Sequence, residues 1–283
     1  MLTTKTIMIK GAGEKATAVA HRLHQCGLKK IVMTELPMPM AERRGVSFCE
    51  AIIEGRKEVS GVLSQKADPS TKMIAEFWKE GKIAVVVDDE ERILSLLKPD
   101  IFIDAVMAKR NTGTTMDKAP LVIALGPGFT ARVDAHFVVE TNPNSHFLGQ
   151  VIMEGPSESD TSVPSPILGL RRKRIIRSPE SGVLHSRREV GDMVRENEVI
   201  GTVNGSPLLA PLEGVVWGLV RDGVTVKAGK KIGDIDPRGK RELCFEIAAQ
   251  ARSIAGGVLE AVLRGLSAKN GEKRTGHALH NCL

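Results

Sequence analysis

One pattern recurs in the second half of the chain at a constant offset of 32 residues, without a gap. The matched positions are prolines, glycines and aliphatic residues, the types that shape short strands and tight turns. They are Pro179, Gly182 and Val183, which recur as Pro211, Gly214 and Val215; Gly191 and Val194, which recur as Gly223 and Val226; and Ile200 and Gly201, which recur as Ile232 and Gly233. The repeat predicts a small all-β module over residues 166–240, built from two intertwined halves.

The proline and glycine spacing of this module resembles that of the biotinyl/lipoyl barrel-sandwich hybrid. Carriers of that class have a modifiable lysine in the hairpin between the two halves. Here the hairpin runs from Thr202 to Pro207, has Asn204 and Gly205 as its tight turn and contains no lysine. The resemblance therefore implies a barrel-sandwich hybrid without biotin or lipoate, and we expect a binding or docking module.

Residues 1–165 alternate short aliphatic runs with amphipathic segments, which is typical of repeated β-α units. The expected strands include 6–9, 30–34, 83–87, 101–107, 121–125 and 136–139, and a helix is expected over 16–24. Because nearly continuous apolar strands suit a sheet that is covered on both faces, the fold class predicted here is a Rossmann-like, mostly parallel α/β domain.

The segments on either side of the β module have different compositions. Residues 155–169 are rich in Pro, Ser and Gly and form either a linker or a loop that returns to the first domain. Apolar residues recur at helical spacing over 241–267, which predicts a C-terminal helix. Residues 268–283 are polar and lack periodicity, so we expect a disordered tail.

A glycine loop follows the first expected strand. Gly11, Gly13 and Ala16 match the pattern GxGxxA, in which the glycines permit a tight turn and close approach of a phosphate, and the small third residue permits close helix packing. Glu35 ends the second strand, where an acid that binds ribose would lie. This placement predicts binding of a nucleotide or pterin phosphate; the alternative is a glycine turn kept for packing.

Other polar or glycine-rich loops follow the later strands, and the carboxyl ends of parallel strands share one edge of the sheet. Basic side chains and exposed backbone N–H groups there would bind phosphate. The alternative interpretation is that each loop is a connecting turn with solvated charges. The candidates are Lys109, Arg110, Asn111, Gly126, Gly128 and Thr130.

The cysteines and histidines offer few candidates for catalysis or metal binding. The four cysteines include no CxxC pair, which excludes a zinc knuckle and fits a reduced compartment, so we expect a cytoplasmic protein. Cys49 is the candidate carrier of sulfur or selenium, and the alternative is an inert buried thiol. His136, with Glu140, is a candidate metal ligand. A structural or hydrogen-bonding role is the better interpretation, because the segment that contains this histidine is predicted to be a strand.

The overall charge and composition exclude two classes of partner. The chain has a net charge of +6 and a basic run from Arg171 to Arg174, which is either a solvated face or a docking surface for an acidic partner. Nine aromatic residues and no recognition-helix signature argue against nucleic-acid binding. The longest aliphatic run, 83–87, is far too short to span a membrane.

Several motifs together resemble one family, the accessory proteins of selenium-dependent molybdenum hydroxylases (YqeB-like). They are Ile9–Gly13 with Ala20–His24, Ala108–Thr114, Ala124–Thr130 and Gly256–Ala261. The resemblance implies a role in maturing hydroxylases of the xanthine dehydrogenase type, with selenium handled in the pathway. Arg132 and the pair Thr161 and Ser162 depart from the family pattern by adding bulk near the loops.

The leading hypothesis is a maturation factor that binds a molybdopterin-type cofactor or a dinucleotide at the glycine loops and assists selenium or sulfur insertion. Its partners would be the hydroxylase and a selenium or sulfur donor protein. One alternative is an NAD(P)-dependent oxidoreductase, which the glycine loop and Glu35 favour. The other is a non-enzymatic scaffold in which the basic β module docks an acidic partner.

Overall fold

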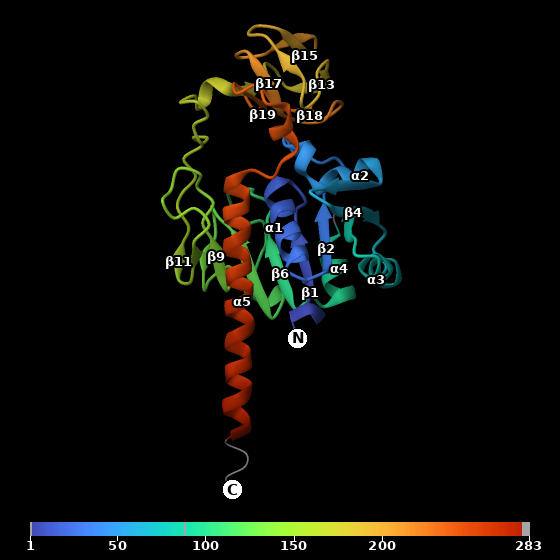
Figure 1. The fold of residues 1–283 in the computed structure, drawn as a ribbon, viewed down its shortest axis with the longest axis vertical. Helices are drawn as coiled ribbons and strands as arrows, with labels where there is room; N and C mark the ends of the chain where they lie inside the picture. Colours follow the sequence, from blue (N-terminus) through green and yellow to red (C-terminus); the bar gives the residue numbers. More distant parts are fainter. Residues whose placement is uncertain (1, 88, 279–283) are drawn as a thin grey trace.

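A single mixed sheet of nine strands forms the centre of the larger body of the molecule, in the order β10-β9-β7-β6-β1-β2-β5-β4-β3 (Figure 1). The computed structural model describes residues 2–87 and 89–278. The strands of this sheet are β1 (Thr6–Lys10), β2 (Lys30–Glu35), β3 (Arg56–Val59), β4 (Val62–Ala67), β5 (Ile83–Val87), β6 (Ile101–Asp104), β7 (Leu121–Leu125), β9 (Phe137–Val139) and β10 (Val151–Ile152).

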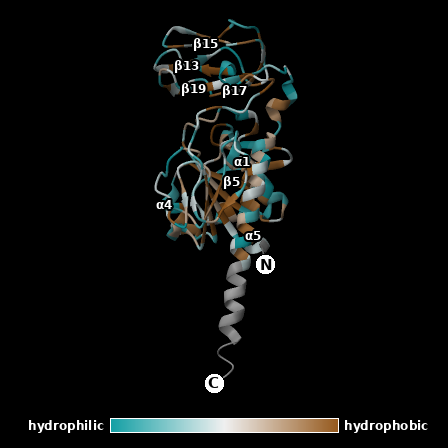
Figure 2. Ribbon diagram, turned by 90° about the vertical axis from the view of Figure 1, so that its left-hand side faces the viewer, coloured by the Kyte–Doolittle hydropathy of each residue, from teal (hydrophilic) through white to brown (hydrophobic). Residues whose placement is uncertain are grey.

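The interior strands run parallel, whereas the two outermost pairs, β3 with β4 and β9 with β10, are antiparallel. Alternate side chains of β1 serve opposite faces, so Ile7 and Ile9 belong to one apolar core and Met8 to the other. Figure 2 shows these apolar strands enclosed by the helices. A continuous run of β-branched residues, as in β5, is stable here because helices cover both faces.

Helices α1 (Glu14–Gln25) and α5 (Ala249–Ala278) cover one face of the sheet, and α3 (Thr71–Lys79) and α4 (Glu90–Leu97) cover the other. A one-turn helix, α2 (Ala51–Glu54), lies over the first face. The expected helix over 16–24 is confirmed as α1, which buries its small apolar face. Within the described residues, no helix is both long and apolar enough to cross a membrane.

Helix α5 begins at Ala249, later than the expected start at 241, because a short 3-10 helix (Arg241–Phe245) precedes it. It packs so closely on the body that a Cβ atom at Gly257 would lie 2.0 Å from the carbonyl oxygen of Gly149. Residues 268–278, the first part of the predicted disordered tail, are helical and form the end of α5, because Ala, Lys, Glu and Arg residues continue a helix without an apolar face. Residues 279–283 lie outside the described residues, and disorder there stays a prediction.

The repeat region folds into two four-stranded antiparallel sheets, in the orders β12-β19-β17-β14 and β16-β15-β13-β18. Both sheets contribute to one apolar core. The strands are β12 (Ile175–Arg177), β13 (Gly182–Ser186), β14 (Met193–Val194), β15 (Val199–Val203), β16 (Ser206–Leu209), β17 (Gly214–Leu219), β18 (Thr225–Val226) and β19 (Lys231–Asp236). We call residues 172–236, which are these strands together with the short 3-10 helix Arg172–Arg174 before them, the β module.

The repeated glycines have a steric reason. A Cβ atom at Gly201 would lie 2.6 Å from the carbonyl oxygen of His185, and one at Gly233 would lie 2.3 Å from that of Gly218. Each glycine thus permits a neighbouring strand to approach, at equivalent positions of the two halves.

The predicted fold class is wrong and is corrected here. The chain has a mixed α/β fold built on one large sheet with antiparallel edges, followed by two small antiparallel sheets, and nothing assigns the latter to the biotinyl/lipoyl barrel-sandwich class. In the β module, the repeat period specifies which residues recur, but it does not specify which strands pair. In the larger body, the sequence analysis missed the antiparallel edge hairpin of β3 and β4, because apolar and polar residues alternate only weakly in β3.

Residues 155–169 return to the body and do not form a free linker. Their β11 (Gly155–Pro156) pairs with β8 (Thr130–Ala131), and Asn144 donates a hydrogen bond to the carbonyl of Val163 at 2.8 Å. The β module then docks on the segment between β2 and β3. There Arg43 donates to the carbonyls of Trp217, Leu243 and Glu246, at 3.0–3.3 Å.

Candidate functional site

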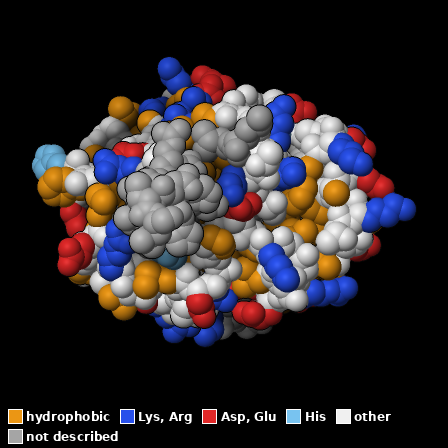
Figure 3. Space-filling view, turned by 90° about the horizontal axis from the view of Figure 1, so that it is seen from below, with side chains coloured by type: hydrophobic (Ala, Val, Ile, Leu, Met, Phe, Trp, Pro, Cys, Tyr) orange, Lys and Arg blue, Asp and Glu red, His pale blue; other side chains and the backbone are white. Residues whose placement is uncertain are grey.

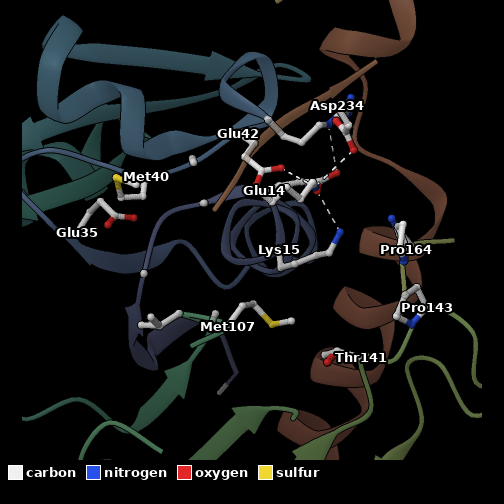
Figure 4. Close-up of a pocket in the computed structure, with 18 of the residues that line it drawn as sticks. Glu14, Lys15, Glu35, Met40, Glu42, Met107, Thr141, Pro143, Pro164 and Asp234 are labelled. Carbon is white, nitrogen blue, oxygen red and sulfur yellow. Dashed lines mark hydrogen bonds and ion pairs between the residues drawn. The ribbon is translucent and has the colours of Figure 1, made fainter. Parts of the chain in front are cut away.

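A cavity of about 790 Å³ lies between the carboxyl ends of β1, β2 and β6 on one side and the β module on the other. Ligands of open α/β sheets bind at such an edge, because the strands end there and the loops diverge. Figure 4 shows its lining: Glu35 and Met40 lie on one side, Pro143 and Pro164 on the other, and Glu14, Lys15 and Asp234 near the β module.

The glycine loop forms one wall of this cavity. Gly11 has φ +92°, and a Cβ atom there would lie 3.2 Å from the backbone of Ala105, so a larger residue would be strained and crowded. Gly13 is the N-cap of α1 and supplies no side-chain cap. The first backbone hydrogen bond of the helix is the one that the N–H of Thr17 donates to the carbonyl of Gly13 at 2.8 Å.

The N-terminus of α1 is therefore open toward the cavity. Among the described residues, the N–H groups of Gly13, Glu14, Lys15 and Ala16 have no hydrogen-bond acceptor. Unsatisfied N–H groups and the helix dipole together attract an anion. Ala16 is fully buried and lets α1 pack against the sheet, as the sequence pattern predicts.

Glu35 lies at the end of β2 and lines the cavity. Its Oε2 accepts the N–H of Ala12 at 2.9 Å, and its Oε1 accepts that of Leu36 at 2.8 Å. The sequence places this acid correctly beside the glycine loop. Its position suits contact with a hydroxyl group of a bound ligand, and its hydrogen bonds also hold the loop.

Two cations lie beside the open end of α1. Glu14 Oε2 is 3.0 Å from Lys15 Nζ, and Glu14 Oε1 is 3.6 Å from Arg43 Nε (Figure 4). Burial acts to raise the pKa of Glu14, but Lys15 and Arg43 hold it below the ordinary value, so the carboxylate is charged.

The opposite wall belongs to the β module and carries a buried ionic network. Arg174 lies 2.6 Å from Asp234, and Lys231 lies 2.5 Å from Glu42 and 3.5 Å from Asp234. Burial raises the pKa of Glu42, and the nearby Asp234 adds to this shift against the opposing effect of Lys231. Because Glu42 belongs to the larger body, this network joins the two parts of the molecule across the cavity.

An aromatic ring completes this wall. The Arg43 guanidinium lies 3.9 Å from the centroid of the Trp217 ring, and the guanidinium of Arg174 lies 5.6 Å from it. Trp217 is only 8% exposed, so it supports the two arginines. The apolar surface available to a ligand comes instead from partly exposed side chains at the other end: Leu36, Met40, Val106 and Met107.

The later loop candidates do not line this cavity. Lys109 is paired with Asp160 at 2.6 Å, and the turn containing Gly128 packs on Arg110, whose Cα would be 2.6 Å from a Cβ at the glycine. Asn111 donates to Asp134 at 2.9 Å and accepts the N–H groups of its own turn.

The other two loop candidates also make local contacts. The N–H of Thr130 donates to Asp134 at 2.7 Å, and the carbonyl of Gly126 accepts from the Thr141 hydroxyl. In the described structure these residues shape loops beside the sheet edge, while the cavity itself receives Thr112 and Thr141 from the same region.

Cys49 is fully buried and lies outside the cavity lining. Burial, reinforced by Glu35 and Glu50, raises the pKa of its thiol well above the ordinary value, so a reactive thiolate is disfavoured. Its backbone N–H donates to the carbonyl of Ala12 at 2.9 Å and so supports the glycine loop. Cys49 thus contributes through its backbone.

His136 has a structural contact, with Nδ1 accepting the N–H of Val122 at 3.0 Å. Over residues 2–87 and 89–278, no group of three or more histidine, cysteine or acidic side chains is arranged to hold a metal ion. The histidine lies beside β9, as the sequence indicates, and a hydrogen-bonding role fits its position.

Sequence reasoning missed the wall that the β module supplies. Arg174 belongs to the basic run starting at Arg171, whose first three members are exposed, yet Arg174 itself is only 3% exposed. Its separation in sequence from Glu42 and the glycine loop hides the contact. The sequence offers one indication of its burial: Arg174 directly precedes the apolar strand β12, so its side chain lies next to residues that pack in the core.

No model of a known protein family matches the chain. A curated relative, the uncharacterized protein YqeB of Escherichia coli strain K12, is 43% identical over 257 residues. The match covers 91% of this chain and 47% of YqeB, so the chain spans about half the length of that relative.

Solved structures give only distant likenesses. A succinylglutamate desuccinylase/aspartoacylase from Rhodobacter sphaeroides is 15% identical with a TM-score of 0.24, covering 82% of this chain and 84% of that one. The protein TcdA (CsdL) is 15% identical with a TM-score of 0.36, covering 95% and 89%. At these TM-scores neither likeness carries a fold class or an activity over to this chain.

Proposed function

We propose that this chain binds the phosphate groups of a molybdopterin-type cofactor or a dinucleotide and acts as a maturation factor for selenium-dependent molybdenum hydroxylases. The observation that carries the binding step is the uncapped N-terminus of α1, which opens into a cavity large enough for such a ligand. Helix N-termini behind glycine loops are a recurring solution for binding pyrophosphate.

The cavity offers complementary chemistry to each part of such a ligand. The N–H groups that begin at Gly13 would bind the phosphates, and Glu35 would accept a ligand hydroxyl group. The exposed apolar surface of Leu36, Met40 and Val106 would receive a flat heterocycle.

The role in hydroxylase maturation rests on the resemblance of the sequence motifs, and the cytoplasmic location expected from the cysteine pattern is part of this proposal. The partners would be a hydroxylase of the xanthine dehydrogenase type and a selenium or sulfur donor. Because the thiol of Cys49 is buried, we assign the chain a part in holding the cofactor, with the chalcogen supplied by the donor.

One observation favours a second candidate, an NAD(P)-dependent oxidoreductase. Glu35 lies at the end of β2 beside the glycine loop, the place of the acid that binds ribose in many dinucleotide sites. The cavity lining includes no histidine or cysteine, so the described lining supplies neither of these common proton-transfer groups for hydride chemistry.

Native mass spectrometry tests the proposal. The chain is purified without oxygen from a selenium-fed host that makes molybdopterin. A retained pterin-containing mass supports the maturation role, and a retained nicotinamide nucleotide supports the oxidoreductase. Protein that is empty here and also fails to bind added dinucleotides or pterin cofactor contradicts the proposed function.

Two variants of Gly13 locate the ligand. A Cβ atom there meets nothing within 4 Å, and φ is −69°, so Gly13→Asp and Gly13→Ala should both fold. Aspartate is a favoured N-cap and would place its own carboxylate on the open N–H groups. Loss of the ligand in Gly13→Asp but not in Gly13→Ala would place the ligand at α1, whereas equal retention would place it elsewhere.

A further inference from the structure

The first residue of α1, Glu14, carries a negative charge and lines the cavity beside the N–H groups that would bind the phosphates of the proposed ligand. Its carboxylate contacts Lys15 and Arg43, and one oxygen, Oε1, is buried and accepts no hydrogen bond among the described residues. The N–H groups of the same helix turn are the anion-binding groups of the proposed function.

The other cations of the cavity lining are also engaged. Lys10 lies 2.7 Å from Glu90, Arg174 lies 2.6 Å from Asp234, and Lys231 lies 2.5 Å from Glu42. Each basic side chain that lines the cavity in the described structure therefore has a carboxylate partner. Lys15 and Arg43 share the single carboxylate of Glu14. A phosphate entering this cavity finds open N–H groups, but every cation that it meets is already in contact with a carboxylate.

The number of charges on each phosphate then decides which ligand binds. A terminal phosphate carries close to two negative charges, whereas each phosphate inside a dinucleotide carries one. Repulsion from a fixed carboxylate grows in proportion to the ligand charge and is stronger in a partly buried site than in water. Backbone N–H groups bind both kinds of phosphate, so they do not cancel this difference.

We infer that Glu14 is a specificity-determining residue that disfavours ligands with a terminal phosphate and selects the internal pyrophosphate of a dinucleotide-type ligand. The inference rests on the proposed function, because it assumes that the phosphates bind at the N-terminus of α1. The lowered pKa of Glu14, which results from Lys15 and Arg43 acting against burial, agrees with a permanent charge at neutral pH.

The test compares two probes, ADP-ribose and ADP, which share adenosine and a pyrophosphate and differ in whether the second phosphate is terminal. Their affinities are measured by calorimetry at one low salt concentration for the full chain and for Glu14→Gln. We expect the natural chain to prefer ADP-ribose. In Glu14→Gln the affinity for ADP should rise about fivefold, and that for ADP-ribose by clearly less.

A matched control removes one negative charge elsewhere. Glu260 lies on α5, is paired with Arg264 and does not line the cavity, so Glu260→Gln should leave the ratio of affinities unchanged. Thermal unfolding monitored by circular dichroism confirms that each variant is folded. In Glu14→Gln, Arg43 keeps its three carbonyl acceptors.

The outcomes separate the inference from the proposed function. If both probes bind and the ratio is the same in Glu14→Gln, the inference is wrong while the phosphate site stands. If both affinities fall in the variant, Glu14 contacts the ligand favourably, and the inference is again wrong. If neither probe binds to any form of the chain, the proposed nucleotide site itself fails and the inference falls with it.

Discussion

The carboxylate of Glu35 bridges the end of β2 to the glycine loop by accepting the backbone N–H of Ala12 at 2.9 Å. The same carboxylate accepts the N–H of Leu36, so it fixes both the loop and the segment that leaves the strand. The candidate ligand site is thus held in shape by one of the residues expected to contact the ligand. Preorganisation of this kind lowers the entropy lost on binding.

Replacement by alanine should cost much more stability at one glycine of the loop than at the other. Gly11→Ala forces φ +92° on a residue with a side chain and places its Cβ 3.2 Å from the backbone of Ala105, so the free energy of unfolding should fall by about 1–3 kcal/mol. Gly13→Ala meets no neighbour and should change it by less than about 1 kcal/mol. Urea denaturation of both variants measures the difference; equal losses would contradict the loop conformation.

Arg221 should be important for stability because it neutralises buried acid. It contacts Glu50, whose side chain is 3% exposed, and also Glu54. Burial raises the pKa of Glu50, and Arg221 opposes this shift. Arg221→Met should lower the free energy of unfolding by about 2 kcal/mol, since the buried carboxylate of Glu50 then keeps only the more distant Arg44, 3.8 Å away, while Arg221 is itself partly exposed.

The double variant tests that explanation for Arg221. Adding Glu50→Gln to Arg221→Met removes the buried charge that has lost its nearer partner and should recover part of the lost stability, as denaturant unfolding would measure. If the two losses simply add, the charge of Glu50 does not depend on Arg221.

The cysteines should differ in reactivity toward an alkylating reagent. Cys26 is exposed at the end of α1, whereas Cys49 and Cys244 are buried. Burial raises the pKa of Cys244 to about 11 and that of Cys49 well above its ordinary value. Iodoacetamide at about pH 8 should label Cys26 in the native chain and leave Cys49 and Cys244 unlabelled until denaturant is added. Peptide mass spectrometry reads the sites, and rapid native labelling of Cys49 would contradict its burial.

His24 should make stability depend on pH in a defined direction. Burial lowers its pKa below 6.5, outweighing the hydrogen bond to the carbonyl of Gly81 at 2.8 Å. The unfolded chain therefore binds a proton before the folded chain does, so this stabilisation is complete above about pH 6.5 and is lost as the pH falls through the folded value. Between about pH 7 and pH 5 the natural chain should lose more stability than His24→Gln. Parallel losses in urea denaturation would rule out this titration.

The sequence predicts local features of this molecule well. The structure confirms the expected strands that begin at Thr6, Lys30, Ile83, Ile101 and Leu121. In each, a run rich in aliphatic, mostly β-branched residues lies between turn residues, and such a run has few alternatives to a strand. The position of Gly11, Gly13 and Glu35 at one edge also follows, since parallel strands bring their carboxyl ends together.

Contacts between distant segments account for what the sequence does not predict. The repeat places glycines where strands approach, but the class of the β module was predicted wrongly, because the period does not determine strand pairing. Arg174 and Lys231 reach the cavity only through docking of that module. Figure 3, which looks at the opposite end of the molecule, shows acidic and basic side chains intermixed, so net charge alone identifies no binding face there.

The chain passes into the β module once and comes back once, and the two crossings touch: the Ser165 hydroxyl lies 3.2 Å from Oε1 of Gln250. The β module is thus an insertion between the last strands of the sheet and the helix that covers them. Removing it would leave the covalent order of the α/β body intact, with the two cut ends already adjacent. The β module, and with it one wall of the cavity, can therefore be inserted or replaced as a unit while the glycine loop stays unchanged.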